Sequence, residues 1–101
     1  MRNTLDGGEA IVEACRKLEC KYILSSPGTE WAPVWEAMAN QKQSGNSGPV
    51  LMDVWHETLA VDIAAGYTMA TGEMQMVLLH AGSGLLQGNM GIHGAFCAGV
   101  P

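Results

Sequence analysis

A histidine and a glutamate, His56 and Glu57, stand where one apolar segment ends and another begins. Segment 50–55 predicts a buried strand, and segment 57–71 predicts a helix. In open α/β sheets ligands bind at the carboxyl ends of the strands. There the amino end of a helix favours an ionised carboxylate, whereas apolar surroundings oppose ionisation. Glu57 as a helix-capping residue is the simpler interpretation, and a carboxylate that exchanges protons with a ligand is the alternative.

A glycine-rich turn follows the next apolar run. Segment 74–80 predicts a strand, and the glycines from Gly82 to Gly88 have the spacing G-x-G-x-x-x-G ahead of a helix expected at 83–98. A nucleotide-binding module would place a pyrophosphate on such a helix amino end. It would also need an acidic residue about 20 positions further on, and no Asp or Glu follows Glu73. Tight packing of the helix is the other interpretation.

The chain offers poor candidates for metal binding or for a nucleophile. His56 and Glu57 lack the second histidine of an H-E-x-x-H motif, because residue 60 is alanine. His93 and Cys97 are one helical turn apart, but two ligands do not close a site. Neither Cys97 nor Ser83 has a base adjacent in the sequence. We therefore expect no metal ligands in this chain.

Helix and strand patterns alternate along the chain. Helices are expected at 6–18, from Pro33 to Asn40, at 57–71 and at 83–98, and strands at 21–24, 50–55 and 74–80. A turn signal, Pro27-Gly28, follows the first strand. This order predicts an α/β fold, a parallel sheet with crossover helices. The strands are continuous apolar runs, which is typical of a sheet covered on both faces.

The last two helices are more apolar than a small domain needs. The helix at 57–71 is apolar nearly all round, so we expect a partner surface or further chain to cover it. The helix at 83–98 has small residues at positions 84, 88, 91, 95 and 98, a row that lets a backbone or a flat ligand approach closely. The sequence ends where the pattern would next supply a strand, so residues 1–101 are expected to form one domain that is incomplete at its C-terminus.

Charge and hydropathy exclude two classes of partner. The net charge of −5 argues against nucleic acid, which needs a basic face. Segment 76–100 is long and uncharged, but as a membrane span it would bury two histidines, a glutamine and an asparagine in lipid. A strand, a glycine turn and a helix explain that segment better, so no membrane partner is expected.

The cysteines and the N-terminus point to the cytoplasm. Cys15, Cys20 and Cys97 are an odd number without CxxC spacing, and residues 15 and 20 fall on different helical faces, which favours reduced thiols. The N-terminal stretch MRNTLDGGEA has no apolar signal core and is not rich in arginine. Neither secretion nor organelle import is indicated.

Four stretches, taken in order, resemble a known family. They are GGEAIVEACRKLECKYIL, PGTEWAPVWEAM, HETLAVDIAAGYTMATG and HAGSGLLQGNMGIHGAFCAGVP. They are similar to the N-terminal pyrimidine-binding (PYR) domain of thiamine diphosphate-dependent enzymes, in the superfamily of acetolactate synthase, pyruvate oxidase and benzoylformate decarboxylase. The most specific piece is the glutamate followed by an Ala/Gly-rich helix that ends in A-T-G. The resemblance spans essentially all of the chain, which corresponds to the first part of one of the family's three domains.

The resemblance implies a role for each candidate residue. Glu57 matches the family's glutamate that bonds N1′ of the aminopyrimidine and favours its imino tautomer, so that the 4′-imino group can take the proton from thiazolium C2. Glu57 is thus the expected catalytic residue. Further contacts are expected with the cofactor at Pro27, Gly28, Gly82 and Gly84, and with the substrate at His56, Ser83 and Gln87.

The resemblance also implies an activity. It indicates a carboligase or decarboxylase (a transferase or lyase) that acts on a small 2-oxo acid, as a homodimer or tetramer with the cofactor at the subunit interface. Mg²⁺ would hold the diphosphate through a G-D-G…N segment of a later domain, which this chain lacks, so the chain alone is expected to be inactive. FAD is compatible with the family but has no support in the sequence. The family often has glycine at the position of Ser25 and asparagine at that of Gln87, and both departures concern substrate choice. A nucleotide-binding α/β module using the Gly82–Gly88 turn is the alternative.

Overall fold

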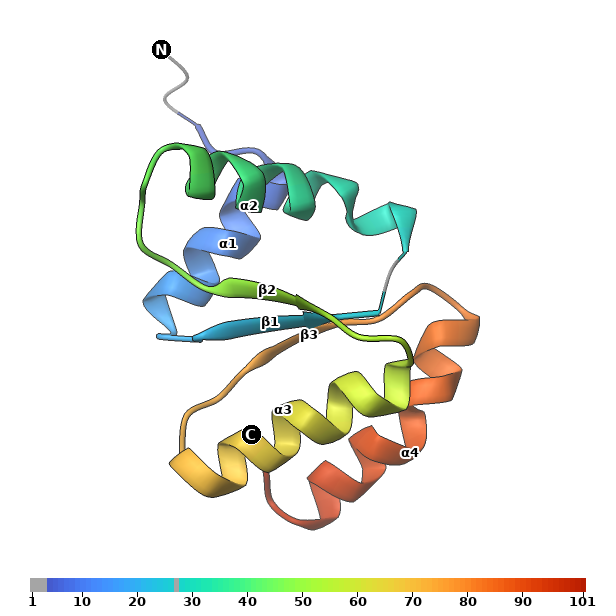
Figure 1. Cartoon of the computed structure of the whole chain (residues 1–101). Coiled ribbons are helices and arrows are strands. Elements are labelled where there is room, and N and C mark those ends of the chain that lie inside the picture. The colour runs from blue at the N-terminus through green and yellow to red at the C-terminus, as the bar shows by residue number, and fades with distance from the viewer. Residues whose placement is uncertain (1–3, 27) are drawn as a thin grey trace.

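In the computed structural model, which describes residues 4–26 and 28–101, a parallel sheet lies between two pairs of helices (Figure 1). The helices are α1 (Gly7–Lys17), the 3₁₀ helix η1 (Thr29–Trp31), α2 (Ala32–Gln43), α3 (Glu57–Thr71) and α4 (Ser83–Cys97). The strands are β1 (Tyr22–Ser25), β2 (Val50–Asp53) and β3 (Met76–Leu78). Within the described residues the strand order is β2-β1-β3. The predicted α/β class, a parallel sheet with crossover helices, is confirmed.

The first helix begins and ends as its sequence dictates. At its start, Oδ1 of Asp6 accepts the Glu9 N–H at 2.8 Å and the Glu9 carboxylate accepts the Asp6 N–H at 2.9 Å, so the two residues form a capping box. At its end, Glu19 has a positive φ of 57° and the Cys20 N–H donates to the Cys15 carbonyl at 2.9 Å. This turn directs the chain into β1.

The turn after α1 also brings two thiols together in the core. Cys15 and Cys20 are free thiols, and both are buried. Cys20 lies beyond the end of α1, so its direction does not follow from the periodicity of that helix. Their expected separation on different helical faces is therefore wrong. Burial is the main cause that raises the pKa of Cys15 to about 11, and it also raises the pKa of Cys20. Both thiols are inert packing groups at neutral pH.

The carboxyl ends of the strands meet at one edge of the sheet. Ser25 at the end of the central strand β1 pairs with Asp53 of β2 on one side and with Leu78 of β3 on the other. Two hydrogen bonds extend the pairing, from the Val54 N–H to the Ser25 carbonyl at 2.9 Å and from the Ser26 N–H to the Leu78 carbonyl at 3.1 Å. The three loops that follow the strands are thereby fixed side by side.

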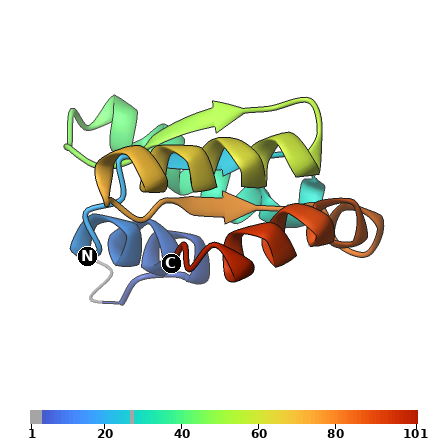
Figure 2. The ribbon, with the colours of Figure 1, turned by 90° about the horizontal axis from the view of Figure 1, so that it is seen from below.

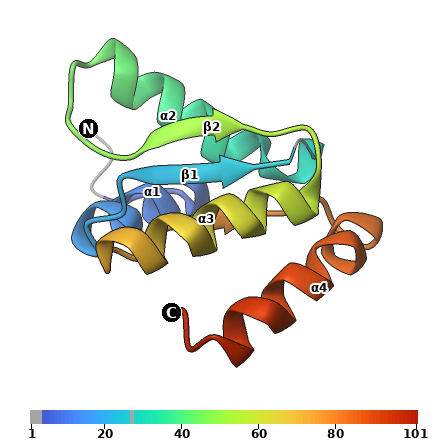
Figure 3. The same ribbon diagram turned by 60° about the horizontal axis from the view of Figure 1, so that its bottom comes forward.

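The helices cover the two faces unequally. α1 and α2 pack on one face, and α3 and α4 on the other (Figures 1 and 2). β2 lies at the border of the sheet (Figure 3), and its Val50 and Met52 are exposed, so the expectation that both faces of every strand are covered is wrong for β2. Leu59, Ile63 and Met69 of α3 are exposed as well, which is the uncovered apolar surface that the sequence predicts.

The row of small residues in α4 faces α3. A Cβ on Gly91 would lie 3.0 Å from both Val61 and Asp62, and the Thr58 hydroxyl donates to the Gln87 carbonyl at 2.7 Å. The close approach that the small residues predict is therefore made by a neighbouring helix. Across the described residues, we find no helix with the length and apolar character needed to cross a bilayer.

Candidate active site

Glu57 is the first residue of α3, directly after the loop that follows β2. The helix cap is the preceding residue: the Nδ1 atom of His56, an exposed side chain, accepts the Thr58 N–H at 3.1 Å. Since His56 caps the helix, the interpretation of Glu57 as the capping residue is wrong. Glu57 is half-buried, and its carboxylate has no hydrogen-bond or ion-pair partner among the described residues. Such a carboxylate is free to bind a ligand.

The glycine turn after β3 lies against this carboxylate. Gly82 adopts a positive φ of 66° as the turn enters α4, a conformation that favours glycine. Gly84 is buried, and a Cβ at this position would lie 2.9 Å from Oε1 of Glu57 and 2.6 Å from Cβ of His80. Glycine at position 84 thus keeps the Glu57 oxygen clear and lets the loops after β2 and β3 touch.

The remaining predicted residues of α4 are placed differently. A Cβ on Gly88 would meet the Leu79 side chain at 2.7 Å, so this third glycine serves helix packing. Ser83 and Gln87 are exposed on the first two turns of the helix. Their side chains lie beside the turn, but the structure gives them no partner among the described residues.

The loop after β1 completes the edge. Pro27 lies outside the described residues. Gly28 is buried, and a Cβ here would collide with the ring of His80 and lie 2.6 Å from the carboxylate oxygens of Glu30. A side chain at position 28 would therefore displace the His80 ring or the Glu30 carboxylate from their present places.

A carboxylate–imidazole pair links these two loops. Nδ1 of His80 lies 3.0 Å from both carboxylate oxygens of Glu30, and the Ala81 N–H donates to Oε1 of the same carboxylate. Next to it, the Trp31 indole N–H donates to the Leu79 carbonyl at 2.7 Å. The hydrogen bond from its own backbone N–H is the largest cause that lowers the pKa of Glu30, and desolvation opposes it. The hydrogen bonds from Ala81 and His80 add to the lowering, so the pKa stays below its ordinary value.

Sequence reasoning did not single out Glu30 or His80. A signal for His80 was present, because it ends the apolar run at 74–80 as Glu57 follows the run at 50–55. Polar residues at the carboxyl ends of parallel strands meet at one edge. Glu30 gave no such signal, since its partner is 50 residues away.

A cavity of about 790 Å³ opens beside the pair. Glu30 and His80 contribute the titratable side chains of its lining, which we call its polar end. Its apolar walls come from α3, β3 and α4 and include Val61, Val77, Leu79, Leu85, Ile92 and Phe96. Glu57 does not line this cavity, so the edge of the sheet presents two adjacent features, a carboxylate at a glycine turn and an apolar groove with a histidine at its end.

Comparison with known proteins decides the family. Residues 5–101 match the sequence model of the family described as thiamine pyrophosphate enzyme, N-terminal TPP binding domain. The chain belongs to this family. It is 31% identical over 97 residues to an acetolactate synthase large subunit of Haemophilus influenzae, an alignment that covers 96% of the chain and 16% of that relative. No solved structure matches the chain.

The family match confirms the resemblance and favours it over the nucleotide-binding alternative. The site fits the pyrimidine half of the cofactor on one structural ground, because Glu57 is half-buried, is not needed for the helix cap and faces a glycine where a side chain would obstruct it. For the diphosphate half, the described residues bring together no group of three or more His, Cys, Asp or Glu side chains suited to a metal ion. Nε2 of His93 lies 3.5 Å from Sγ of Cys97 on α4, and these two side chains form an isolated pair among the described residues.

Proposed function

We propose that this chain holds the aminopyrimidine ring of thiamine diphosphate at Glu57, in an acetolactate synthase-like enzyme that joins or decarboxylates 2-oxo acids. The observation that carries the proposal is the position of the Glu57 carboxylate, half-buried and 2.9 Å from where Gly84 would carry a Cβ. The family match supports cofactor binding, and the acetolactate synthase relative supports the choice of chemistry.

The proposed role of Glu57 is to hold a proton at N1′ of the pyrimidine. When bound, thiamine diphosphate supplies the electron sink for breaking or forming a carbon–carbon bond next to a carbonyl group. Glu57 tunes the ring by sharing a proton with N1′. Its half-buried place strengthens that hydrogen bond by keeping water away. Gly84 leaves room for the ring by lacking a side chain, and Gly82 and Gly28 shape the loops on either side.

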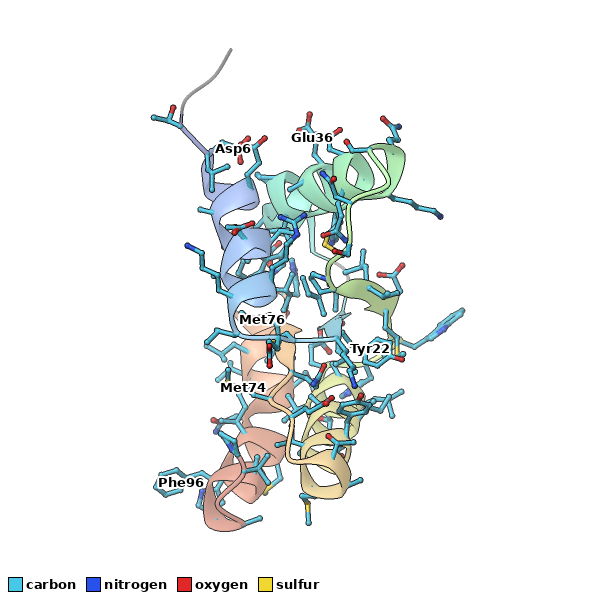
Figure 4. All side chains as sticks on the ribbon, turned by 90° about the vertical axis from the view of Figure 1, so that its left-hand side faces the viewer. Asp6, Tyr22, Glu36, Met74, Met76 and Phe96 are labelled. Atoms are coloured by element: carbon cyan, nitrogen blue, oxygen red, sulfur yellow. The ribbon has the colours of Figure 1, made fainter. Side chains whose placement is uncertain are left out.

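The rest of the assembly is proposed from the same basis. Since the chain covers 16% of the acetolactate synthase relative, the diphosphate and its Mg²⁺ are assigned to a domain outside it. A homo-oligomer with the cofactor at the interface is supported by apolar side chains that point away from the chain on α4. Phe96 among them is 80% exposed (Figure 4). Such exposed apolar surface is typical of interaction sites. A cytoplasmic location stays a prediction.

The test is Glu57→Gln in the cofactor-bound enzyme. The amide has the size of the carboxyl group and can still form a hydrogen bond, but it cannot transfer a proton to N1′. We expect exchange of the C2 proton of bound thiamine diphosphate to slow by about a hundredfold or more, the range typical of general acid–base groups. Quenched-flow exchange followed by NMR measures this rate directly.

The matched control is Glu36→Gln, an exposed glutamate on the outer side of α2 (Figure 4). It removes the same charge and leaves the edge of the sheet untouched, so its exchange rate should equal that of the wild type. Cofactor affinity is measured for both variants. Exchange at the wild-type rate in Glu57→Gln, with cofactor bound, would remove Glu57 from the mechanism.

A further inference from the structure

Glu30 contacts two successive residues of the turn after β3. Both of its oxygens lie 3.0 Å from Nδ1 of His80, and Oε1 also accepts the Ala81 N–H. η1 and the β3–α4 turn are 50 residues apart in the sequence, so one carboxylate joins two loops of the site. The Trp31 hydrogen bond to Leu79 holds η1 in the same place.

The chemistry of the contact determines where the His80 ring carries its proton. An ionised carboxylate only accepts hydrogen bonds, so Nδ1 of His80 must be the donor. A neutral imidazole has one N–H, which leaves Nε2 unprotonated and able to accept. In the described part of the chain, Nε2 of His80 has no hydrogen-bond partner.

We infer that Glu30 is a positioning residue that fixes His80 as the Nδ1–H tautomer and so presents an unprotonated Nε2 at the polar end of the apolar groove. Two glycines make room for the His80 side chain, since a Cβ on Gly28 would collide with the ring and a Cβ on Gly84 would lie 2.6 Å from the Cβ of His80. A ligand in the groove would meet a hydrogen-bond acceptor at this end and apolar walls elsewhere.

The contact with Gly84 places His80 next to the proposed cofactor-binding carboxylate. Gly84 lies between the Cβ of His80 and Oε1 of Glu57, which makes the two loops neighbours. The tautomer itself does not depend on any cofactor. Only the role of Nε2 as an acceptor toward a reacting molecule rests on the proposed function.

The test is the ring tautomer of His80 in Glu30→Gln, read from ring ¹⁵N shifts by NMR at a pH well above the titration of histidine side chains. The chain has three histidines, and His80→Gln assigns the signal by removing it. In the wild type we expect Nδ1 to be protonated. In Glu30→Gln the amide oxygen stays on the Ala81 N–H and the NH₂ group turns to Nδ1, so the proton should move to Nε2.

Glu36→Gln is again the control and should leave the wild-type tautomer unchanged. A wild-type ring protonated on Nε2, or the same tautomer in wild type and Glu30→Gln, would overturn the inference. Melting temperatures of the variants identify any loss of fold. If Glu30→Gln unfolds the chain, Glu30→Asp is used in its place. Aspartate keeps a carboxylate that accepts a hydrogen bond, so Nε2 protonation in that variant would also overturn the inference. Because these readouts need no cofactor, they stand or fall separately from the Glu57 exchange experiment.

Discussion

The face of the sheet under α1 and α2 buries more large side chains than the face under α3 and α4, where alanines of α3 and glycines of α4 make up part of the packing. The first face buries Val12, Cys15, Cys20, Ile23, Val34, Ala37, Met38 and Leu78. The second buries Leu24, Val54, Ala60 and Ala64, with glycines of α4 packed on α3. Most large apolar side chains of α3 and α4 are exposed, namely Leu59, Ile63, Met69, Leu85, Leu86, Met90, Ile92 and Phe96.

This difference separates two tasks within one small fold. The α1/α2 face supplies most of the apolar burial and holds the strands in register. The α3/α4 face brings backbones close together at the glycine turn and leaves its larger apolar groups available for contacts. Stability should therefore respond most strongly to changes on the first face, and the site to changes on the second.

The largest expected effect on stability is at the centre of the first face. Ile23 is fully buried in β1, and Ile23→Ala should lower the free energy of unfolding by roughly 3 to 4 kcal/mol, from lost transfer energy and the cavity left behind. Ile63 of α3 is 37% exposed, so Ile63→Ala should cost less than about 1 kcal/mol. Urea unfolding followed by circular dichroism compares the two. Equal losses would refute the division between the faces.

Much of this fold was predictable because its boundaries have local causes. α3 covers residues 57–71 as predicted, since a side chain caps its start and Gly72, with a positive φ of 77°, ends it. β3 is shorter than the predicted strand at 74–80, and Gln75 shows why. Its side chain accepts the Tyr22 N–H at 2.8 Å, so it bonds to the neighbouring strand's backbone from outside β3. Such a tertiary contact leaves no periodic pattern in the sequence.

The residues of the site were predictable where a family motif directly follows a predicted strand, and they were not predictable elsewhere. Glu57 and Gly84 follow strands whose carboxyl ends must share an edge, so their proximity could be expected. The pairing of Glu30 with His80 depends on how η1 sits over β3, which only the folded chain defines. The capping role of His56 was missed because histidine is an uncommon helix cap, and its pairing with Thr58 is a matter of rotamer.

Glycine-to-alanine variants on the two faces of the sheet should lower the stability by intermediate amounts, and they test the same difference between the faces. A Cβ on Gly8 of α1 would collide with the Pro33 carbonyl and lie 3.0 Å from the Val34 nitrogen, and backbone atoms cannot yield easily. Gly8→Ala should therefore destabilise the fold by about 2 to 3 kcal/mol. On the other face, the Cβ of Gly88→Ala meets only the end of the flexible Leu79 side chain, so we expect a loss of about 1 kcal/mol.

The control for both glycine variants is Gly66→Ala in α3. A Cβ at this position meets nothing within 4 Å, so alanine should stabilise the helix by up to about 1 kcal/mol. Thermal unfolding of the three variants checks the order. A Gly8→Ala protein as stable as Gly66→Ala would mean that α1 and α2 can separate without loss.

The smallest expected effect comes from the polar contacts that fasten the end of α3 to β1. Nζ of Lys21 lies 2.9 Å from the Glu73 carboxylate, which also accepts the Tyr67 hydroxyl at 3.2 Å. The Glu73 hydrogen bond raises the pKa of Lys21 above 10.5, and the same bond lowers the pKa of Glu73 below 4.5. Both groups are at the surface, where such pairs contribute little.

The signs of these two shifts fix the pH window of the contact. The lowered pKa of Glu73 means that its contribution is present above 4.5 and is lost as the pH falls through the folded value. The raised pKa of Lys21 means that its contribution is present below 10.5 and is lost as the pH rises through the folded value. Lys21→Met should lower the melting temperature slightly between these limits and make no difference well outside them, with Lys17→Met of α1 as the control. A Lys21→Met deficit that persists at a pH well below the lowered, folded-state pKa of Glu73 would show that packing of the lysine stem, and not the ion pair, stabilises the contact between α3 and the sheet.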